Sequence, residues 1–145
     1  MSRPLRIEFA GALYHVMSRG NERGEIVRDD SDRQGRLDWL RRTGEMYGWR
    51  LQAFVLMTNH DHLFVETPEP NLSAGMQYLN GSYTSYFNRR HSRCGHLFQG
   101  RFKAHLIQEE GSFLQGSRYI HLNPVRANLV ARPEDYQWSS YRGYQ

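Results

Sequence analysis

The sequence contains a single cysteine, Cys94, in 145 residues. One cysteine excludes an internal disulfide and fits a reducing compartment, so we expect a cytoplasmic protein. Long hydrophobic runs are also missing. The longest uninterrupted apolar run, Ala53 to Met57, is far too short for a membrane span. We therefore expect no membrane partner, and the length suits one domain over residues 1–145.

Lysine is rare throughout the chain, and acidic residues are missing from one region. Lys103 is the only lysine among 19 basic residues, and no acidic residue lies between Asn71 and Gln108. Residues 71–145 carry 9 basic and 4 acidic residues, a net charge of +5; residues 1–70 carry 10 and 11, a net charge of −1. Arginine suits bidentate phosphate contacts, although a coding bias would give the same composition. The second half of the chain is thus expected to meet a polyanion.

Hydrophobic periodicity and turn residues predict alternating strands and helices. The predicted strands are Leu13 to Met17, Arg50 to Met57, Asp61 to Glu66 and Arg101 to Gln108, and the predicted helices are Asp32 to Tyr47, Leu72 to Arg90 and a last helix from Glu109 or Glu110. A capping-box pattern at Ser31 to Gln34 and a glycine at Gly48 mark the ends of the first helix. The last helix should stop near Leu122 or Asn123, because Pro124 disfavours helical geometry in the residue before it.

The order β-α-β-β-α-β followed by a helix predicts an α+β protein with a ferredoxin-like sheet. In that arrangement the first and third strands are central, and the first two helices cover one face of the sheet. The other face is free for a functional site, but the fold alone says nothing about chemistry. The Arg50 to Met57 strand has an apolar segment typical of a strand buried on both faces.

Two histidines, His60 and His62, stand one residue apart at the start of the third strand. Side chains alternate along a strand, so both imidazoles project to the same face at a spacing that lets them share one metal ion. A pair of solvated strand histidines has the same spacing, and the pair alone does not decide between the two.

Tyr119 and Asn123 lie four residues apart on the last predicted helix and share a face. If this helix crosses the open sheet face, a phenol, an amide oxygen and two imidazoles could converge. An amide oxygen favours harder ions such as Mg²⁺ or Mn²⁺. Such an ion could polarise a phosphate oxygen and template in-line attack by the tyrosine. The alternative for Tyr119 is a helix tyrosine that packs its ring.

The segment from Asn88 to Lys103 combines basic charge with rings, which suits single-stranded nucleic acid through phosphate contacts and base stacking. Its candidate DNA-binding residues are Arg89, Arg90, Arg93, His96, Phe98, Arg101 and Lys103, with Arg19, Arg118 and Arg126 as second-tier candidates. A solvated basic loop with Phe98 in the core is the competing interpretation.

Three motifs in order resemble the single-tyrosine HUH transposases, and among these the REP-associated tyrosine transposases of bacteria. They are His60-Asp61-His62, the runs Asn88 to His91 and Gly95 to Lys103, and Tyr119 to Arg126. The resemblance covers nearly the whole chain and implies a metal-dependent endonuclease that acts on single-stranded DNA folded into hairpins, such as REP-like palindromes. Related transposases include monomers and homodimers, and many relatives continue further at the C-terminus.

By the family's pattern, Tyr119 is the nucleophile that forms a 5′-phosphotyrosine, and His60 and His62 ligate the metal. Asn123 takes the third-ligand position, where related transposases carry glutamine. The residue between the histidines is usually hydrophobic, and here it is Asp61. Asp61 should point to the opposite sheet face and leave the metal site intact.

Two other functions remain open from the sequence. One is a non-catalytic nucleic-acid-binding domain of the same fold with structural histidines. The other is a zinc-stabilised domain that uses His60, His62, Cys94 and His96, although Cys-x-His is a poor zinc signature without a second cysteine.

Overall fold

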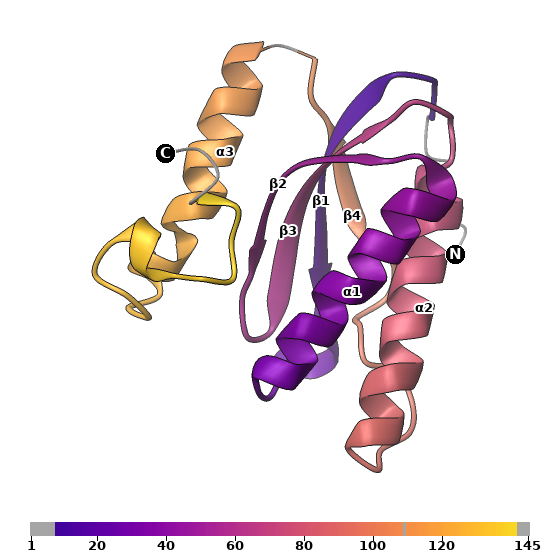
Figure 1. Cartoon of the computed structure of the whole chain (residues 1–145), viewed down its shortest axis with the longest axis vertical. Helices are drawn as coiled ribbons and strands as arrows, with labels where there is room; N and C mark the ends of the chain where they lie inside the picture. Colours follow the sequence, from indigo (N-terminus) through magenta and orange to yellow (C-terminus); the bar gives the residue numbers. More distant parts are fainter. Residues whose placement is uncertain (1–7, 109, 142–145) are drawn as a thin grey trace.

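A computed structural model describes residues 8–108 and 110–141 of the chain. It contains a four-stranded antiparallel sheet and three α-helices, which makes it an α+β protein (Figure 1). The elements are β1 Ala12–Arg19, η1 Asn21–Arg23, α1 Asp30–Tyr47, β2 Arg50–Leu56, β3 His60–Thr67, α2 Leu72–Arg90, β4 Lys103–Leu106, α3 Glu110–Arg126 and η2 Pro133–Asp135. None of the helices in the described ranges is long and apolar enough to cross a membrane.

The strands lie in the order β2-β3-β1-β4, so the first and third strands are central, as the sequence predicts. β1 pairs antiparallel with β3 along its whole length, from Ala12 opposite Thr67 to Arg19 opposite His60. The helices α1 and α2 cover one face of the sheet, and α3 lies on the other face (Figure 1). We call these the helix-pair face and the α3 face.

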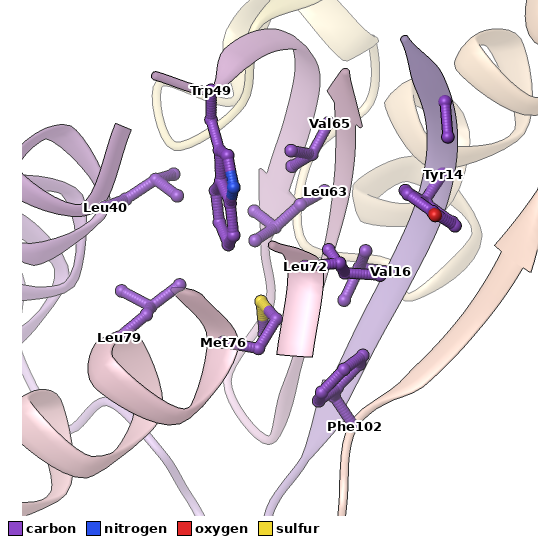
Figure 2. Packing of buried hydrophobic residues seen from close by; sticks show 11 residues of the cluster. Tyr14, Val16, Leu40, Trp49, Leu63, Val65, Leu72, Met76, Leu79 and Phe102 are labelled. Atoms are coloured by element: carbon purple, nitrogen blue, oxygen red, sulfur yellow. The ribbon is translucent and has the colours of Figure 1, made fainter. Parts of the chain in front are cut away.

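The main hydrophobic core fills the helix-pair face (Figure 2). Tyr14 and Val16 of β1 point into it, because alternate residues of a strand share a face. Met76 and Leu79 of α2 meet them from the helix side and are fully buried. Trp49 packs against Gly75, where an added Cβ would come within 2.1 Å of the indole, so only glycine allows α2 to lie this close.

The helix boundaries differ from the predictions at two places. Asp29, not Ser31, caps α1: its carboxylate accepts a hydrogen bond from the backbone of Asp32 at 2.9 Å. Gly48 ends the helix in the left-handed conformation, as predicted, with φ of 72°. The prediction that the last helix stops before Pro124 is wrong, because α3 continues to Arg126.

Pro124 removes one backbone donor, but the chain around it keeps its hydrogen bonds. The backbone of Ala127 donates to Asn123 at 2.9 Å, and that of Leu129 donates to Pro124 at 2.9 Å. Glu109, one of the two predicted starting residues of the helix, lies outside the described residues. The fourth strand is shorter than predicted, since only Lys103–Leu106 pairs with β1.

The second strand is not buried on both faces along its length. β2 is an edge strand, and its first three residues are exposed. Its second half is buried because the segment after η2 lies along it: the backbone of Leu56 donates to Trp138 at 2.8 Å, and that of Ser140 donates to Phe54 at 3.0 Å. This segment satisfies backbone groups that an open sheet edge would leave unpaired.

Candidate active site on the α3 face

The two histidines project from β3 onto the α3 face. The centroids of the His60 and His62 rings are 5.1 Å apart, and the rings are perpendicular. Phe64, two residues further, points the same way and packs against Ile120 of α3. The alternation of strand side chains therefore places both imidazoles under α3, as their spacing predicts.

Burial keeps both imidazoles neutral. It lowers the pKa of His62 to about 3, with smaller contributions from the neighbouring His15, His60 and Arg19. Burial also lowers the pKa of His60, and the nearby Arg19 lowers it further against the opposing effect of Asp61. A neutral imidazole has a lone pair that can bind a metal ion, so both side chains are in the form that a ligand needs near neutral pH.

A third histidine, His15 of β1, supports the pair from the side. Its Nε2 lies 2.9 Å from Nδ1 of His62, a hydrogen bond that fixes the orientation of the His62 ring. Burial lowers the pKa of His15 to about 4. Metal-binding histidines commonly donate their other ring N–H to a neighbour, and a neutral His15 can accept such a bond through Nε2.

Asp61 points to the opposite face, as predicted. Its carboxylate is fully buried and meets the guanidinium of Arg36 from α1, with an Nε–Oδ2 distance of 2.7 Å and an Nη2–Oδ1 distance of 3.3 Å. Arg36 also donates to Asn80 of α2 at 2.9 Å, and Asn80 donates to Ser18 of β1 at 3.1 Å. This network, here called the Arg36 network, ties both helices to the two central strands directly beneath the histidines.

α3 approaches the sheet closely enough to bring Tyr119 over the histidines. An added Cβ at Gly116 would lie 2.5 Å from Cζ of the buried Phe64 ring, so glycine is needed for this approach. Tyr119 follows three residues later, and its ring stands edge-on to His62 with centroids 6.1 Å apart. Tyr119 is 51% exposed, so a large substrate could reach its hydroxyl.

Asn123 lies one helical turn beyond Tyr119. Its amide oxygen accepts a hydrogen bond from Arg126 at 3.1 Å. The same guanidinium lies over the Tyr119 ring, 4.4 Å from its centroid, and donates to the Tyr119 backbone carbonyl at 2.6 Å. Arg126 therefore connects the two α3 residues that the sequence singles out.

The alternative of a structural zinc site is wrong. Within the described residues, no group of three or more His, Cys, Asp or Glu side chains could hold a metal ion. The four zinc candidates are all described, and Cys94 is exposed on the loop after α2. A metal on the α3 face would be held by two imidazoles together with an oxygen ligand of another kind.

The predicted DNA-binding residues fall into two groups. Four are exposed and lie on β1, which pairs with β3, on β4, which pairs with β1, and on α3, which carries Tyr119: Arg19, Lys103, Arg118 and Arg126. Arg19 pairs with His60 across the sheet, and Lys103 pairs with Met17, whose neighbours on that face are His15 and Arg19. The second group comprises Arg89, Arg90, Arg93, His96, Phe98 and Arg101, at the end of α2 and on the loop that follows it.

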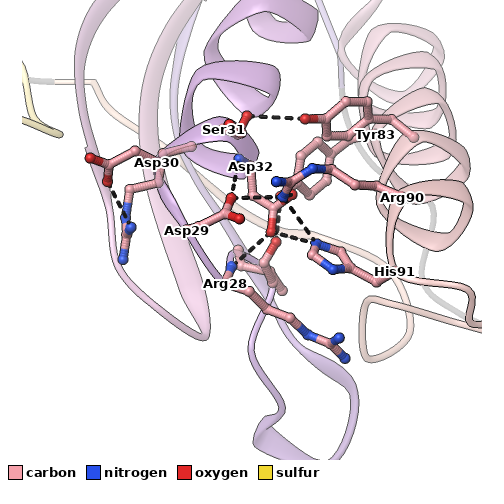
Figure 3. A network of polar contacts seen from close by, with 11 residues as sticks. Arg28, Asp29, Asp30, Ser31, Asp32, Tyr83, Arg90 and His91 are labelled. Carbon is pink, nitrogen blue, oxygen red and sulfur yellow. Dashed lines mark hydrogen bonds and ion pairs between the residues drawn. The ribbon is translucent and has the colours of Figure 1, made fainter.

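Several members of the second group have structural partners. Arg90 bridges Asp29 and Asp32 at the start of α1, at 2.7 and 2.8 Å, and holds the pKa of the Asp29 carboxyl at about 2 (Figure 3). His91 lies 2.7 Å from the second oxygen of Asp32. Figure 3 shows these side chains converging between the end of α2 and the start of α1.

The loop after α2 is held in a similar way. Arg93 donates to the Asn88 side chain at 2.5 Å and to the carbonyl of His96 at 3.1 Å. Phe98 is half-buried, with the Arg36 guanidinium 5.0 Å from its ring centroid. Within this group, Arg89, His96 and Arg101 expose their side chains.

His15 and Arg36 were not predicted as part of the site. His15 lies on the same strand face as Met17 and Arg19, opposite to the buried Tyr14 and Val16. Strand alternation therefore assigns His15 to the α3 face once the core face of β1 is known. Its contact with His62 depends on the register between β1 and β3, which no sequence pattern reveals. Arg36 lies on α1, and its pairing with Asp61 joins residues 25 positions apart in the sequence.

Solved structures share this fold, among them the following two. One is a REP-associated tyrosine transposase bound to a REP hairpin, with a TM-score of 0.81 and 19% identity over 98% of this chain and 84% of that chain. The other is a protein from Deinococcus radiodurans R1 described as a transposase, with a TM-score of 0.57 and 21% identity over 82% of this chain and 95% of that one.

Sequence comparison identifies the protein family more specifically than the shared fold does. A Haemophilus influenzae protein that carries the name REP-associated tyrosine transposase is 28% identical over 112 residues. This match covers 70% of the present chain and 64% of the relative, so part of the relative's length has no counterpart in it. Residues 9–123 match the family described as "Transposase IS200 like", and the chain belongs to that family. The resemblance to tyrosine transposases drawn from the motifs is thereby confirmed.

Proposed function

We propose that the chain is a metal-dependent endonuclease and strand transferase that nicks hairpin-flanked single-stranded DNA through a covalent 5′-phosphotyrosine at Tyr119. The observation that carries the proposal is the placement of Tyr119 edge-on to His62 by a helix whose approach depends on Gly116. Membership of the IS200-like transposase family supports the same chemistry. The likeness to a fold seen with a REP hairpin supports the substrate class.

The reaction exchanges one phosphate ester for another. The Tyr119 oxygen attacks the phosphorus, its proton passes to solvent, and a Tyr–O–P bond forms as the P–O3′ bond breaks. The departing 3′ oxygen takes up a proton and becomes a hydroxyl. Because a phosphodiester is replaced by a phosphodiester, a 3′-hydroxyl can reverse the step and join strands without an added energy source.

The donors present fit a divalent ion such as Mg²⁺ or Mn²⁺. His60 and His62 supply neutral imidazoles on one face, and Asn123 supplies an amide oxygen. The bound ion would polarise a phosphate oxygen. Arg126, which holds both the Asn123 oxygen and the Tyr119 ring, would orient these two groups and offer positive charge to the same phosphate.

Binding is assigned to residues from both groups, most of them basic and exposed. Arg19, Lys103, Arg118 and Arg126 would hold the strand at the site, while Arg89, Arg93, His96, Phe98 and Arg101 would extend the surface along the loop after α2. Arg90 would contribute through the loop geometry that it fixes as well as through charge. We also assign the sheet to the ferredoxin-like class and residues 1–145 to one catalytic domain.

The test is a nicking assay on a single strand that carries a hairpin, with Mg²⁺ or Mn²⁺ and with a chelator in parallel. We expect cleavage only with metal and expect the His60→Ala plus His62→Ala double variant to bind the hairpin but not cleave it. Undiminished cleavage by the double variant would refute the metal assignment. Tight hairpin binding by the wild type with no cleavage under any metal would favour the non-catalytic DNA-binding alternative.

A further inference from the structure

A cavity of about 490 Å³ lies between α2 and the loop that leads to β4, on the helix-pair face and thus across the sheet from Tyr119. Figure 1 shows this loop running beside α2. The volume falls in the range of small-ligand sites and exceeds what a single planar base needs. The chemical step proposed above uses none of the residues that line it, although His96, Phe98 and Arg101 belong to the proposed DNA-binding surface.

The lining combines rings, neutral polar groups and positive charge. Met76 and Phe102 form a buried apolar part, and Phe98 adds a second ring. Gln77 and Thr84 offer an amide and a hydroxyl, and none of the lining residues carries a carboxylate. A cavity without carboxylates is unsuited to a cation, whereas rings beside amides suit the faces and edges of a nucleobase.

Positive charge lies at the cavity in the form of Arg101, whose side chain is exposed. An arginine beside a ring-lined cavity can hold the phosphate of the nucleotide whose base enters it. The same loop contacts the end of β1: Gly20 forms a bridge with Phe98, and the backbone of Gln99 donates to Arg19 at 2.8 Å. Arg19 in turn pairs with His60.

We propose that this cavity binds one unpaired nucleobase of the DNA strand, with Arg101 on its phosphate. This inference rests on the proposed function and adds a second contact point for the strand. A DNA strand that crosses the protein at Gly20, at the end of β1, would reach both the cavity and the α3 face. Gln77 and Thr84 would contact the edge of the base, so the cavity would contribute to sequence preference.

Gly81 allows the cavity to be filled without disturbing the fold. It lines the cavity from α2, and an added Cβ there meets no atom within 4 Å. Leucine is also a better helix former than glycine. The Gly81→Leu side chain should therefore fill the cavity. The variant should be at least as stable as the wild type, with an unfolding midpoint at no lower denaturant concentration. Ser85→Leu is the matched control, because Ser85 is exposed on the same helix and does not line the cavity.

The experiment measures affinity for three probes: a hairpin without a tail, the same hairpin with an unpaired tail on either side, and the tailed hairpin with abasic sites in place of the tail bases. The abasic tail keeps every phosphate and removes the bases. We expect the base-bearing tail to strengthen binding by wild type and Ser85→Leu by about tenfold over the abasic tail, the effect of roughly one stacked base. Gly81→Leu should lose this gain and keep its affinity for the tailless hairpin.

Equal affinity of Gly81→Leu and wild type for the base-bearing tail would overturn the cavity assignment and leave the proposed nuclease untouched. The same conclusion follows if wild type does not distinguish the base-bearing tail from the abasic tail. Failure of the wild type to bind any of the three probes would overturn both proposals together.

Discussion

The two faces of the sheet are built from the same strands and differ in what they hold. On the helix-pair face, the strands meet two long helices, which bury a hydrophobic core and the Arg36–Asp61 ion pair. On the α3 face, one helix covers part of the sheet and leaves Tyr119 half exposed over His62. Of three consecutive residues of β3, His60 and His62 point to the α3 face, and Asp61 points to the helix-pair face.

This comparison shows how a short strand motif can serve two purposes. The imidazoles are held by a backbone whose other side is anchored through Asp61 to α1, α2 and β1. Substitutions on the helix-pair face should therefore lower stability first, and substitutions on the α3 face should lower activity first. The following experiments test that division, from the largest expected effect to the smallest.

Removing one partner of the buried ion pair should have the largest effect on stability. Arg36→Met leaves the Asp61 carboxylate buried and unpaired, which costs about 3–5 kcal/mol in the free energy of unfolding. Arg36→Met combined with Asp61→Leu removes both charges and should recover most of that loss. Urea unfolding measures both. A loss of less than about 1 kcal/mol for the single variant would remove the anchoring role of the Arg36 network.

Filling the space between α3 and the sheet should lower both the stability and the activity of the protein, because the same contact sets the fold of the α3 face and the position of Tyr119. Gly116→Ala places a Cβ against the buried Phe64 ring, and overpacking of this kind costs about 1–3 kcal/mol. It should also slow cleavage, because Tyr119 moves away from His62. Gly111→Ala on the same helix meets no atom within 4 Å and is the control. Equal effects of the two variants on nicking would contradict the account.

His15 of β1, which contacts His62, should strengthen metal binding without contacting the metal itself. His15→Phe removes the hydrogen bond to His62 and should weaken Mn²⁺ binding by about 10–100-fold, the usual effect of losing such a supporting group. Titration calorimetry on metal-free protein measures this apart from activity. His105→Phe changes the exposed residue paired with His15 on β4 and should leave the affinity unchanged. An unchanged affinity in His15→Phe would exclude the supporting role.

Acidification of the metal-free protein should reveal the buried imidazoles. The pKa of His62 is about 3 when folded, and an unfolded histidine has a pKa near ~6.5, so between these values only the unfolded state takes up the proton. Stability therefore falls as the pH falls from about 6.5 towards 3, by up to about 1.4 kcal/mol per pH unit from this residue. Chemical unfolding across this pH range, with a chelator present, should show a shallower slope for His62→Gln. A slope identical to that of the wild type would indicate that His62 titrates normally in the folded protein.

Much of this architecture was predictable because it depends on local signals. The strand spacing of His60 and His62 and the helical spacing of Tyr119 and Asn123 gave the right elements, and Gly48 ends α1 where a glycine was expected. The alternation of strand side chains also predicted the opposite orientation of Asp61.

The parts that could not be predicted depend on contacts between distant segments. The partner of Asp61 lies 25 residues away on α1, and the partner of His62 lies 47 residues away on β1. The continuation of α3 through Pro124 is a local exception: the backbone of Ala127 donates to Asn123 and that of Leu129 to Pro124, within five residues in the sequence. Arg90 and Arg93 looked like free phosphate ligands because the acidic and amide groups that hold them become neighbours only in the folded chain.

The most direct test of the account is to locate the covalent bond to DNA. Hairpin-bearing single strands are incubated with protein and metal, the adduct is isolated under denaturing conditions, and tryptic peptides are analysed by mass spectrometry. Cleavage after Arg118 and Arg126 yields the peptide Tyr119–Arg126, which contains a single tyrosine. We expect the nucleotide on this peptide and no adduct from Tyr119→Phe, which should still fold and bind the hairpin. An adduct on Tyr83, Tyr86 or Tyr136, or one that persists in Tyr119→Phe, would contradict the assignment of the α3 face as the active site.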